Sequence, residues 1–94
     1  MLFAIFCTDK PDSADVRAAN RPAHLDYVRA IADQVVFAGP TQSDDGQSMN
    51  GSLLVMNFDD LAAARAFADN DPYFTAGLFE SVVVRPWKQV FPEA

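Results

Sequence analysis

The sequence has little of what metal and disulfide sites require. Its 94 residues include one cysteine and one histidine, so no internal disulfide and no cluster of Cys and His ligands is expected. The isolated glycines form no phosphate-cradling loop, which argues against a nucleotide. We therefore expect no metal ion and no cofactor. Cys7 falls inside a predicted strand, where a small buried hydrophobe is a simpler interpretation than a reactive thiol.

Positive charge is also scarce. Seven basic residues stand against thirteen acidic ones, a formal net charge of −6, so a surface that binds nucleic acid or an anionic membrane is not expected. The opening segment MLFAIFCTDK has no basic stretch before its short apolar run and no small-residue cleavage site. These features predict a cytoplasmic protein that binds neither nucleic acid nor membrane.

Hydrophobic residues, by contrast, are abundant. Half of the residues are apolar, including eight phenylalanines, which is too hydrophobic for a disordered chain. A chain of this length can bury a modest core, and no linker, repeat or change in composition divides it. We expect a single domain over residues 1–94.

Runs of apolar and β-branched residues predict the strands. Four are expected, at residues 2–8 and in QVVFAGP, SLLVMNF and LFESVVVRPW, with KQVF as a short fifth strand. Strands with one face in water should alternate apolar and polar residues, yet these runs are apolar at nearly every position. Both faces of the sheet therefore need cover. Helices can shield one, and we expect the other to pack against a second copy of the chain; the alternative is a monomer with a lipid-like ligand there.

Helical periodicity fills the intervals between these strands. A first helix is expected from Ser13 to about Ala32, restarting near Pro22 with Asn20 as its cap. A second is expected at residues 60–69, capped by Asp59, and a short helical turn ended by Gly77 follows it. The resulting β-α-β-β-α-β order predicts an α+β, ferredoxin-like fold with helices on one face of an antiparallel sheet.

The single histidine is placed where chemistry is possible. His24, Tyr27, Val28 and Ile31 are spaced i, i+3, i+4, i+7, which puts the imidazole on the helix stripe that faces the sheet. A partly buried histidine that only satisfies its hydrogen bonds is the simpler interpretation.

Asp71 has both a structural and a chemical interpretation. Followed by Pro72, it fits the N-cap of a short helical turn. A carboxylate held by backbone N–H groups stays anionic and can orient a neighbouring imidazole. The next candidates to pair with the histidine are Asp9 and Asp12, for which turn formation is an adequate explanation.

Two further residues could contact a substrate. Arg21 lies within one turn of His24 and could hold an anionic group, although a solvated guanidinium is the simpler interpretation. Ser52, after Gly51, could donate a hydrogen bond to a ligand or simply begin a strand.

Taken together, the segments DKPDSADVRAANRPAHLDYV, AGP and GSLLVMNFDDLAAARAFADNDPYFTAGLFESVVVRPWKQVF resemble the YCII-related domain family. The resemblance covers nearly the whole chain. It implies a ferredoxin-like fold that dimerises through its sheets, an assembly of the dimeric α/β-barrel type. It also implies a catalytic pair of His24 in RPAHL and Asp71 in DPY, with Tyr73 of the same motif joining Arg21 and Ser52 as candidate substrate-binding residues.

These expectations lead to one main functional hypothesis. The chain is predicted to be a cofactor-independent enzyme that acts on a small, cyclic, oxygenated metabolite by elimination, isomerisation or hydrolysis, with His24 as acid or base and Asp71 orienting it. One related member resembles a lyase that removes chloride from a hydroxylated aromatic ring. The alternatives are a non-catalytic homodimer that binds a small ligand or a protein, and an oxygenase-like relative on the same scaffold.

Overall fold

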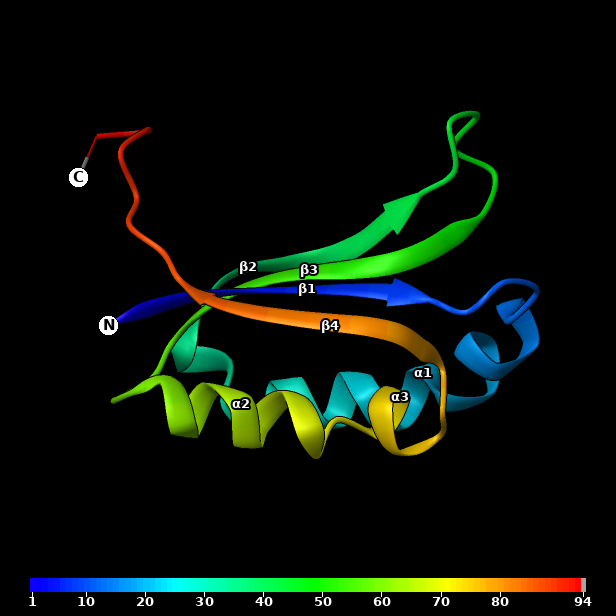
Figure 1. Cartoon of the computed structure of the whole chain (residues 1–94), viewed down its shortest axis with the longest axis horizontal. Helices are drawn as coiled ribbons and strands as arrows, with labels where there is room; N and C mark the ends of the chain where they lie inside the picture. Colours follow the sequence, from blue (N-terminus) through cyan, green and yellow to red (C-terminus); the bar gives the residue numbers. More distant parts are fainter. Residues whose placement is uncertain (94) are drawn as a thin grey trace.

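A computed structural model describes residues 1–93, which form one antiparallel sheet with its helices gathered on one face (Figure 1). The strands, in the spatial order β2-β3-β1-β4, are β1 (Leu2–Asp9), β2 (Val35–Gln42), β3 (Met49–Asn57) and β4 (Phe79–Pro86). The helices are α1 (Ala14–Arg29), α2 (Leu61–Asp69), α3 (Pro72–Thr75) and the 3₁₀ turn η1 (Ala32–Gln34). The predicted ferredoxin-like α+β fold is confirmed.

The core lies between the sheet and the helices. Phe3, Ile5 and Cys7 alternate along β1 toward the helices, and antiparallel pairing sets Met56 and Leu54 of β3 beside the first two. Cys7 is buried, and this burial, reinforced by the negative charge of Asp71, raises the pKa of its thiol to about 12. The expected role of Cys7 as an inert core residue is confirmed.

The predicted restart of the first helix is wrong. α1 runs without interruption through Pro22, and Asn20 is no cap, because its side-chain amide donates to the Val16 carbonyl within the same helix. Pro22 removes the hydrogen bond that its own N–H would have made, and its ring crowds the carbonyl of the preceding turn. Contacts on both sides offset this cost: Tyr27 and Val28 pack against the core after the proline, and Arg17 before it binds Asp9 of β1.

Other boundaries also differ from expectation, among them the start of β3 at Met49, three residues before the expected SLLVMNF. α1 ends at Arg29, with η1 filling the interval before β2. Asp60, not Asp59, caps α2, since its carboxylate accepts the Ala63 N–H at 2.8 Å. The segment KQVF forms no strand, because after Trp87 donates its N–H to the Leu2 carbonyl the chain makes no further ladder bonds with β1.

The face of the sheet opposite the helices is apolar and uncovered within residues 1–93 (Figure 1). Phe6 on β1, Phe37 on β2 and Val83 on β4 are 46, 47 and 40% exposed. The Phe37 and Trp87 rings form a T-shaped pair, with centroids 6.2 Å apart. Side chains of this size cost free energy when they remain in water, so this face favours a partner.

Candidate active site

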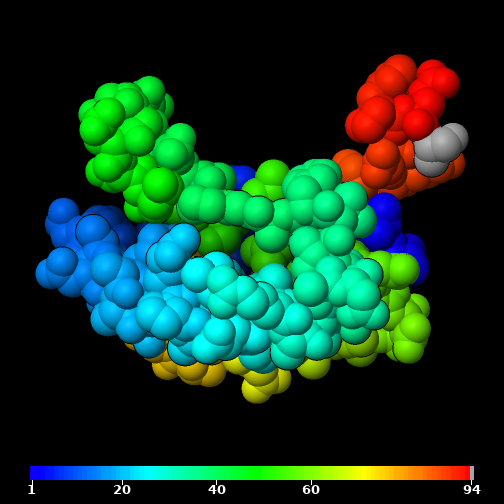
Figure 2. Space-filling model, turned by 180° about the vertical axis from the view of Figure 1, so that it is seen from behind, coloured from blue at the N-terminus to red at the C-terminus, as the bar shows by residue number. Residues whose placement is uncertain are grey.

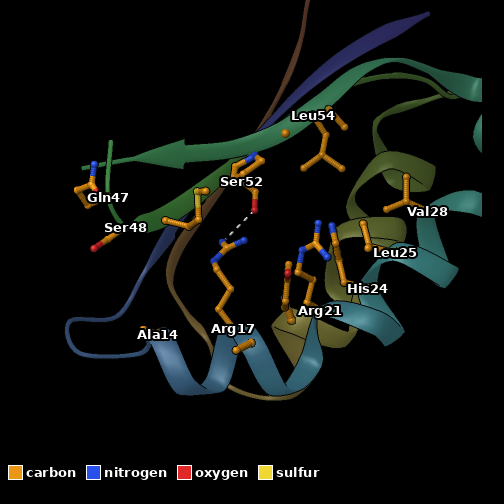
Figure 3. Close-up of a pocket in the computed structure, with 16 residues that line it drawn as sticks. Ala14, Arg17, Arg21, His24, Leu25, Val28, Gln47, Ser48, Ser52 and Leu54 are labelled. Atoms are coloured by element: carbon orange, nitrogen blue, oxygen red, sulfur yellow. Dashed lines mark hydrogen bonds between the residues drawn. The ribbon is translucent and has the colours of Figure 1, made fainter. Parts of the chain in front are cut away.

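A pocket of about 570 Å³ lies between α1 and the inner face of β2 and β3. β2 is an edge strand, and α2 packs against β1 and β4 toward the opposite edge of the sheet, which leaves a recess between α1 and β2 (Figure 2). Arg17, Arg21 and His24 line it from α1 at the spacing i, i+4, i+7, so all three side chains share one helix face. Figure 3 shows them extending from α1 toward β3.

His24 and Asp71 are in direct contact beside this pocket. The His24 Nδ1 lies 3.0 Å from both carboxylate oxygens of Asp71, and the two side chains are 12 and 6% exposed. An ionised carboxylate only accepts, so with Asp71 charged the proton of a neutral imidazole lies on Nδ1. The Nε2 atom then carries the free lone pair, and no hydrogen bond to it is present within residues 1–93.

The same carboxylate also begins α3. Asp71 accepts the Tyr73 backbone N–H at 2.9 Å, and Pro72 occupies the first turn of that helix. The Tyr73 N–H holds the carboxylate in the position at which it contacts His24. Capping and contact with His24 are therefore compatible functions of one side chain.

Tyr73 fills the space between two side chains of α1. Its ring stacks on the His24 ring, with centroids 4.1 Å apart and an interplanar angle of 17°, and the Arg17 guanidinium carbon lies 4.6 Å from its centroid. Burial raises the pKa of Tyr73, although the charges of Arg17 and Arg21 act in the opposite direction, so the hydroxyl stays neutral and can donate near neutral pH. Tyr73 is 2% exposed and lines the pocket, and its hydroxyl interacts with the Arg17 guanidinium.

Arg17 is the site residue that the sequence analysis missed. Its Nε donates to Asp9 Oδ2 at 2.7 Å and its Nη2 to Asp9 Oδ1 at 2.8 Å, and Nη2 also reaches Ser52 Oγ at 3.1 Å (Figure 3). Burial acts to lower the pKa of Arg17, but the hydrogen bond and charge of Asp9 outweigh it and raise the pKa. The sequence did contain a signal for this residue, because Arg17 precedes Arg21 and His24 at the spacing of one helix stripe.

The remaining candidate residues differ in their positions relative to the pocket. Ser52 lies within β3, is buried and serves Arg17, whereas Arg21 lines the pocket without an ion pair or side-chain hydrogen bond among residues 1–93. The Asp9 side chain lies on the same inner face of β1 as Cys7, where it binds Arg17 and not His24. Asp12 is exposed in the first loop at a φ of 56° and lines no part of the pocket.

No three His, Cys, Asp or Glu side chains within residues 1–93 are grouped so that they could hold a metal ion. None of the helices described is long and apolar enough to cross a membrane.

Comparison with known proteins supplies the context for this geometry. The family model for the YCII-related domain matches residues 1–88. Protein YciI of Escherichia coli O6:H1 is 40% identical over 98 aligned residues, which cover 97% of this chain and all of the relative.

Solved structures give a second line of comparison. The 5-chloro-2-hydroxyhydroquinone dehydrochlorinase of Burkholderia phenoliruptrix AC1100, in complex with 2,5-dihydroxybenzoquinone, is 35% identical with a TM-score of 0.90, and both chains are covered completely. The cofactor-independent oxygenase SnoaB of Streptomyces nogalater is 14% identical with a TM-score of 0.55, over 98% of this chain and 96% of its own. The second similarity concerns the fold alone.

Proposed function

The chain belongs to the YCII-related domain family, and from this premise we propose that it is an enzyme that carries out acid–base chemistry on a small oxygenated ring compound, using His24 and Asp71. The observation that carries the proposal is the contact between His24 Nδ1 and Asp71 beside a pocket of about 570 Å³. An imidazole fixed through one nitrogen presents the other to a bound molecule, as general acid–base catalysis requires.

The proposed roles follow from the positions of the side chains. His24 Nε2 takes a proton from a substrate hydroxyl, while Asp71 retains the Nδ1 proton and stabilises the imidazolium that forms. Tyr73 and Arg21 bind substrate oxygens, and Ser52 contributes indirectly by holding Arg17. An elimination is the favoured reaction class, in which the electron pair released by deprotonation expels a leaving group and His24 returns its proton to solvent; isomerisation and hydrolysis need the same base.

The dehydrochlorinase supports this choice of class. Its name records loss of hydrogen chloride from a hydroxylated ring, and it was solved with an oxygenated ring compound bound. At 35% identity over the full length of both chains, the likeness is close enough to choose the first substrates to test, but it does not transfer the reaction itself.

Turnover of a defined panel tests the proposal. Purified wild-type protein is incubated with chlorinated and unchlorinated hydroxyhydroquinones, and with dihydroxybenzoquinones, and products are followed by absorbance and released chloride. We expect conversion of at least one compound above the rate without protein. If no compound is converted, the pair of His24 and Asp71 is better explained as a structural hydrogen bond in a ligand-binding protein.

We further propose that the protein is a homodimer that buries the apolar sheet face, in an assembly of the dimeric α/β-barrel type. Phe6, Phe37 and Val83 support this, because all three are large, apolar and 40 to 47% exposed. The variant Phe6→Lys is expected to elute as a monomer in light-scattering chromatography, whereas wild type elutes as a dimer. Glu80→Lys, an exposed charge change on β4, is the matched control and should stay dimeric. A wild-type monomer at micromolar concentration would contradict the proposal.

A further inference from the structure

The pocket has two chemically different ends. At one end lie the polar groups of Arg21, His24 and Tyr73. Leu25 and Val28 continue α1 beyond His24, and with Leu54 of β3 they form an apolar arm, which Figure 3 shows displaced to one side of the charged side chains. Ala38, which pairs with Leu54, closes the arm from the inner face of β2.

The polar end carries one positive charge, that of Arg21, without an ion pair among the described residues. Arg17 is neutralised by its bidentate contact with Asp9, and Asp71 is committed to His24. Arg21, by contrast, has no ion pair within residues 1–93. The Arg21 guanidinium and the neutral Tyr73 hydroxyl line the same pocket, and both are donors suited to an anionic oxygen.

The size of the pocket matters as much as its charge. Pockets of about 300 to 1,000 Å³ typically hold ligands of drug size, and this pocket, at about 570 Å³, lies in the middle of that range. A single oxygenated ring at Arg21 and His24 would leave the apolar arm filled with water. Leu54 is only 2% exposed, but Leu25 and Val28 are partly exposed on the pocket wall. Water against these two side chains is unfavourable, so a ligand that extends into the arm gains affinity.

We propose that the substrate is an amphipathic anion, with an acidic oxygenated ring held by Arg21, Tyr73 and His24 and an apolar substituent lying in the arm formed by Leu25, Val28 and Leu54. The identity of the ring rests on the proposed function above, whereas the apolar substituent rests on the shape and lining of the pocket. Substrate choice in this chain is therefore expected to depend on the substituent as well as on the ring.

Calorimetric titration with one ligand series tests the arm. The probes are 2,5-dihydroxy-1,4-benzoquinone and its 3-propyl and 3-hexyl homologues, each titrated into wild type. Burial of a methylene contributes about 0.8 kcal/mol, so affinity should rise by about fourfold for each methylene that enters the arm. The gain should end where the arm does, not continue with chain length.

Two variants locate the effect. Ala38→Phe fills the arm from β2, and in this variant the hexyl and parent compounds should bind with equal affinity. Val36→Phe adds the same ring at an exposed position of the same strand outside the pocket, and should retain the full gain. Arg21→Gln should weaken every member of the series by a similar factor, because each carries the same acidic ring.

Each result decides a separate point. Equal affinity of parent and hexyl compounds for wild type would overturn the apolar arm and leave the proposed function standing. A gain that persists in Ala38→Phe would also overturn it, because the chain would then bind elsewhere. If no member of the series binds, the proposal that the pocket holds an anionic ring is wrong. The turnover panel tests separately whether His24 acts as a base.

Discussion

The variant His24→Ala is expected to lower kcat by about 10²- to 10⁴-fold for any panel compound that wild type converts, because it removes the imidazole proposed to accept the substrate proton. The fold should persist. Asp71 still caps α3 through the Tyr73 N–H, and the His24 side chain is packed at the pocket wall, outside the central core. Steady-state kinetics measure the loss of kcat, and a thermal melt of the same variant shows whether the fold is retained.

The variant Asp71→Asn refines the same prediction. Asparagine is a good N-cap, so α3 should remain intact, but its neutral amide no longer stabilises a protonated imidazole. We expect kcat to fall with little change in melting temperature. Asp26→Asn removes an exposed carboxylate from α1 and is the matched control, for which kcat should not change. Wild-type turnover by a folded His24→Ala protein would exclude the catalytic role.

The variant Arg17→Met is expected to lower the free energy of unfolding more than the variants of His24 and Asp71 do. The buried guanidinium makes two hydrogen bonds to Asp9 and one to Ser52, and without it the Asp9 carboxylate is left buried and unpaired. Breaking a buried ion pair from one side costs about 3 to 5 kcal/mol. For a domain of this size each kcal/mol shifts Tm by about 4 to 8 °C, so circular dichroism melts should show a drop of at least about 12 °C.

Two comparisons define the origin of that loss. Arg29→Met breaks an ion pair with Asp26 whose side chains are 69 and 79% exposed, and such pairs contribute less than about 1 kcal/mol. Adding Asp9→Asn to Arg17→Met removes the unpaired charge and should recover part of the stability. A melting temperature for Arg17→Met equal to that of Arg29→Met would show that the buried pair is not the main contribution.

Local rules predicted the two halves of the candidate dyad separately. Helical spacing placed His24 on the stripe that faces the sheet, and the Asp-Pro step placed Asp71 at an N-cap, because both depend on neighbours within one or two turns. Their contact joins residues 47 positions apart. Only the family pattern suggested that contact before the structure was known.

Those local rules could not predict the polar cluster of Arg17, Asp9 and Ser52. Whether an arginine is solvated or buried depends on what the sheet presents to it, and Asp9 and Ser52 come from two different strands. Strand alternation already pointed Asp9 inward, since it follows Cys7 by two positions, but a polar residue at a strand end is also a good turn former. The pocket itself depends on the spacing between α1 and the inner face of β2 and β3, which is a property of the tertiary arrangement.

The errors have equally specific causes. Pro22 was expected to break the first helix, but packing on the sheet outweighs the loss of one backbone bond. The segment KQVF has the composition of a strand, yet within residues 1–93 it finds no neighbouring strand to pair with. In both cases local propensity was overruled by what lies beside the segment.

The most direct test of the central claim is the position of the proton on the His24 ring. A long-range nitrogen–proton NMR spectrum of isotope-labelled protein distinguishes the two neutral tautomers, and one histidine in the sequence makes the assignment unambiguous. We expect the neutral ring of wild type to carry its proton on Nδ1, donated to Asp71, and Asp71→Leu to lose that preference. A wild-type ring with its proton on Nε2 would contradict the claim, because the nitrogen facing the pocket could then not act as a base.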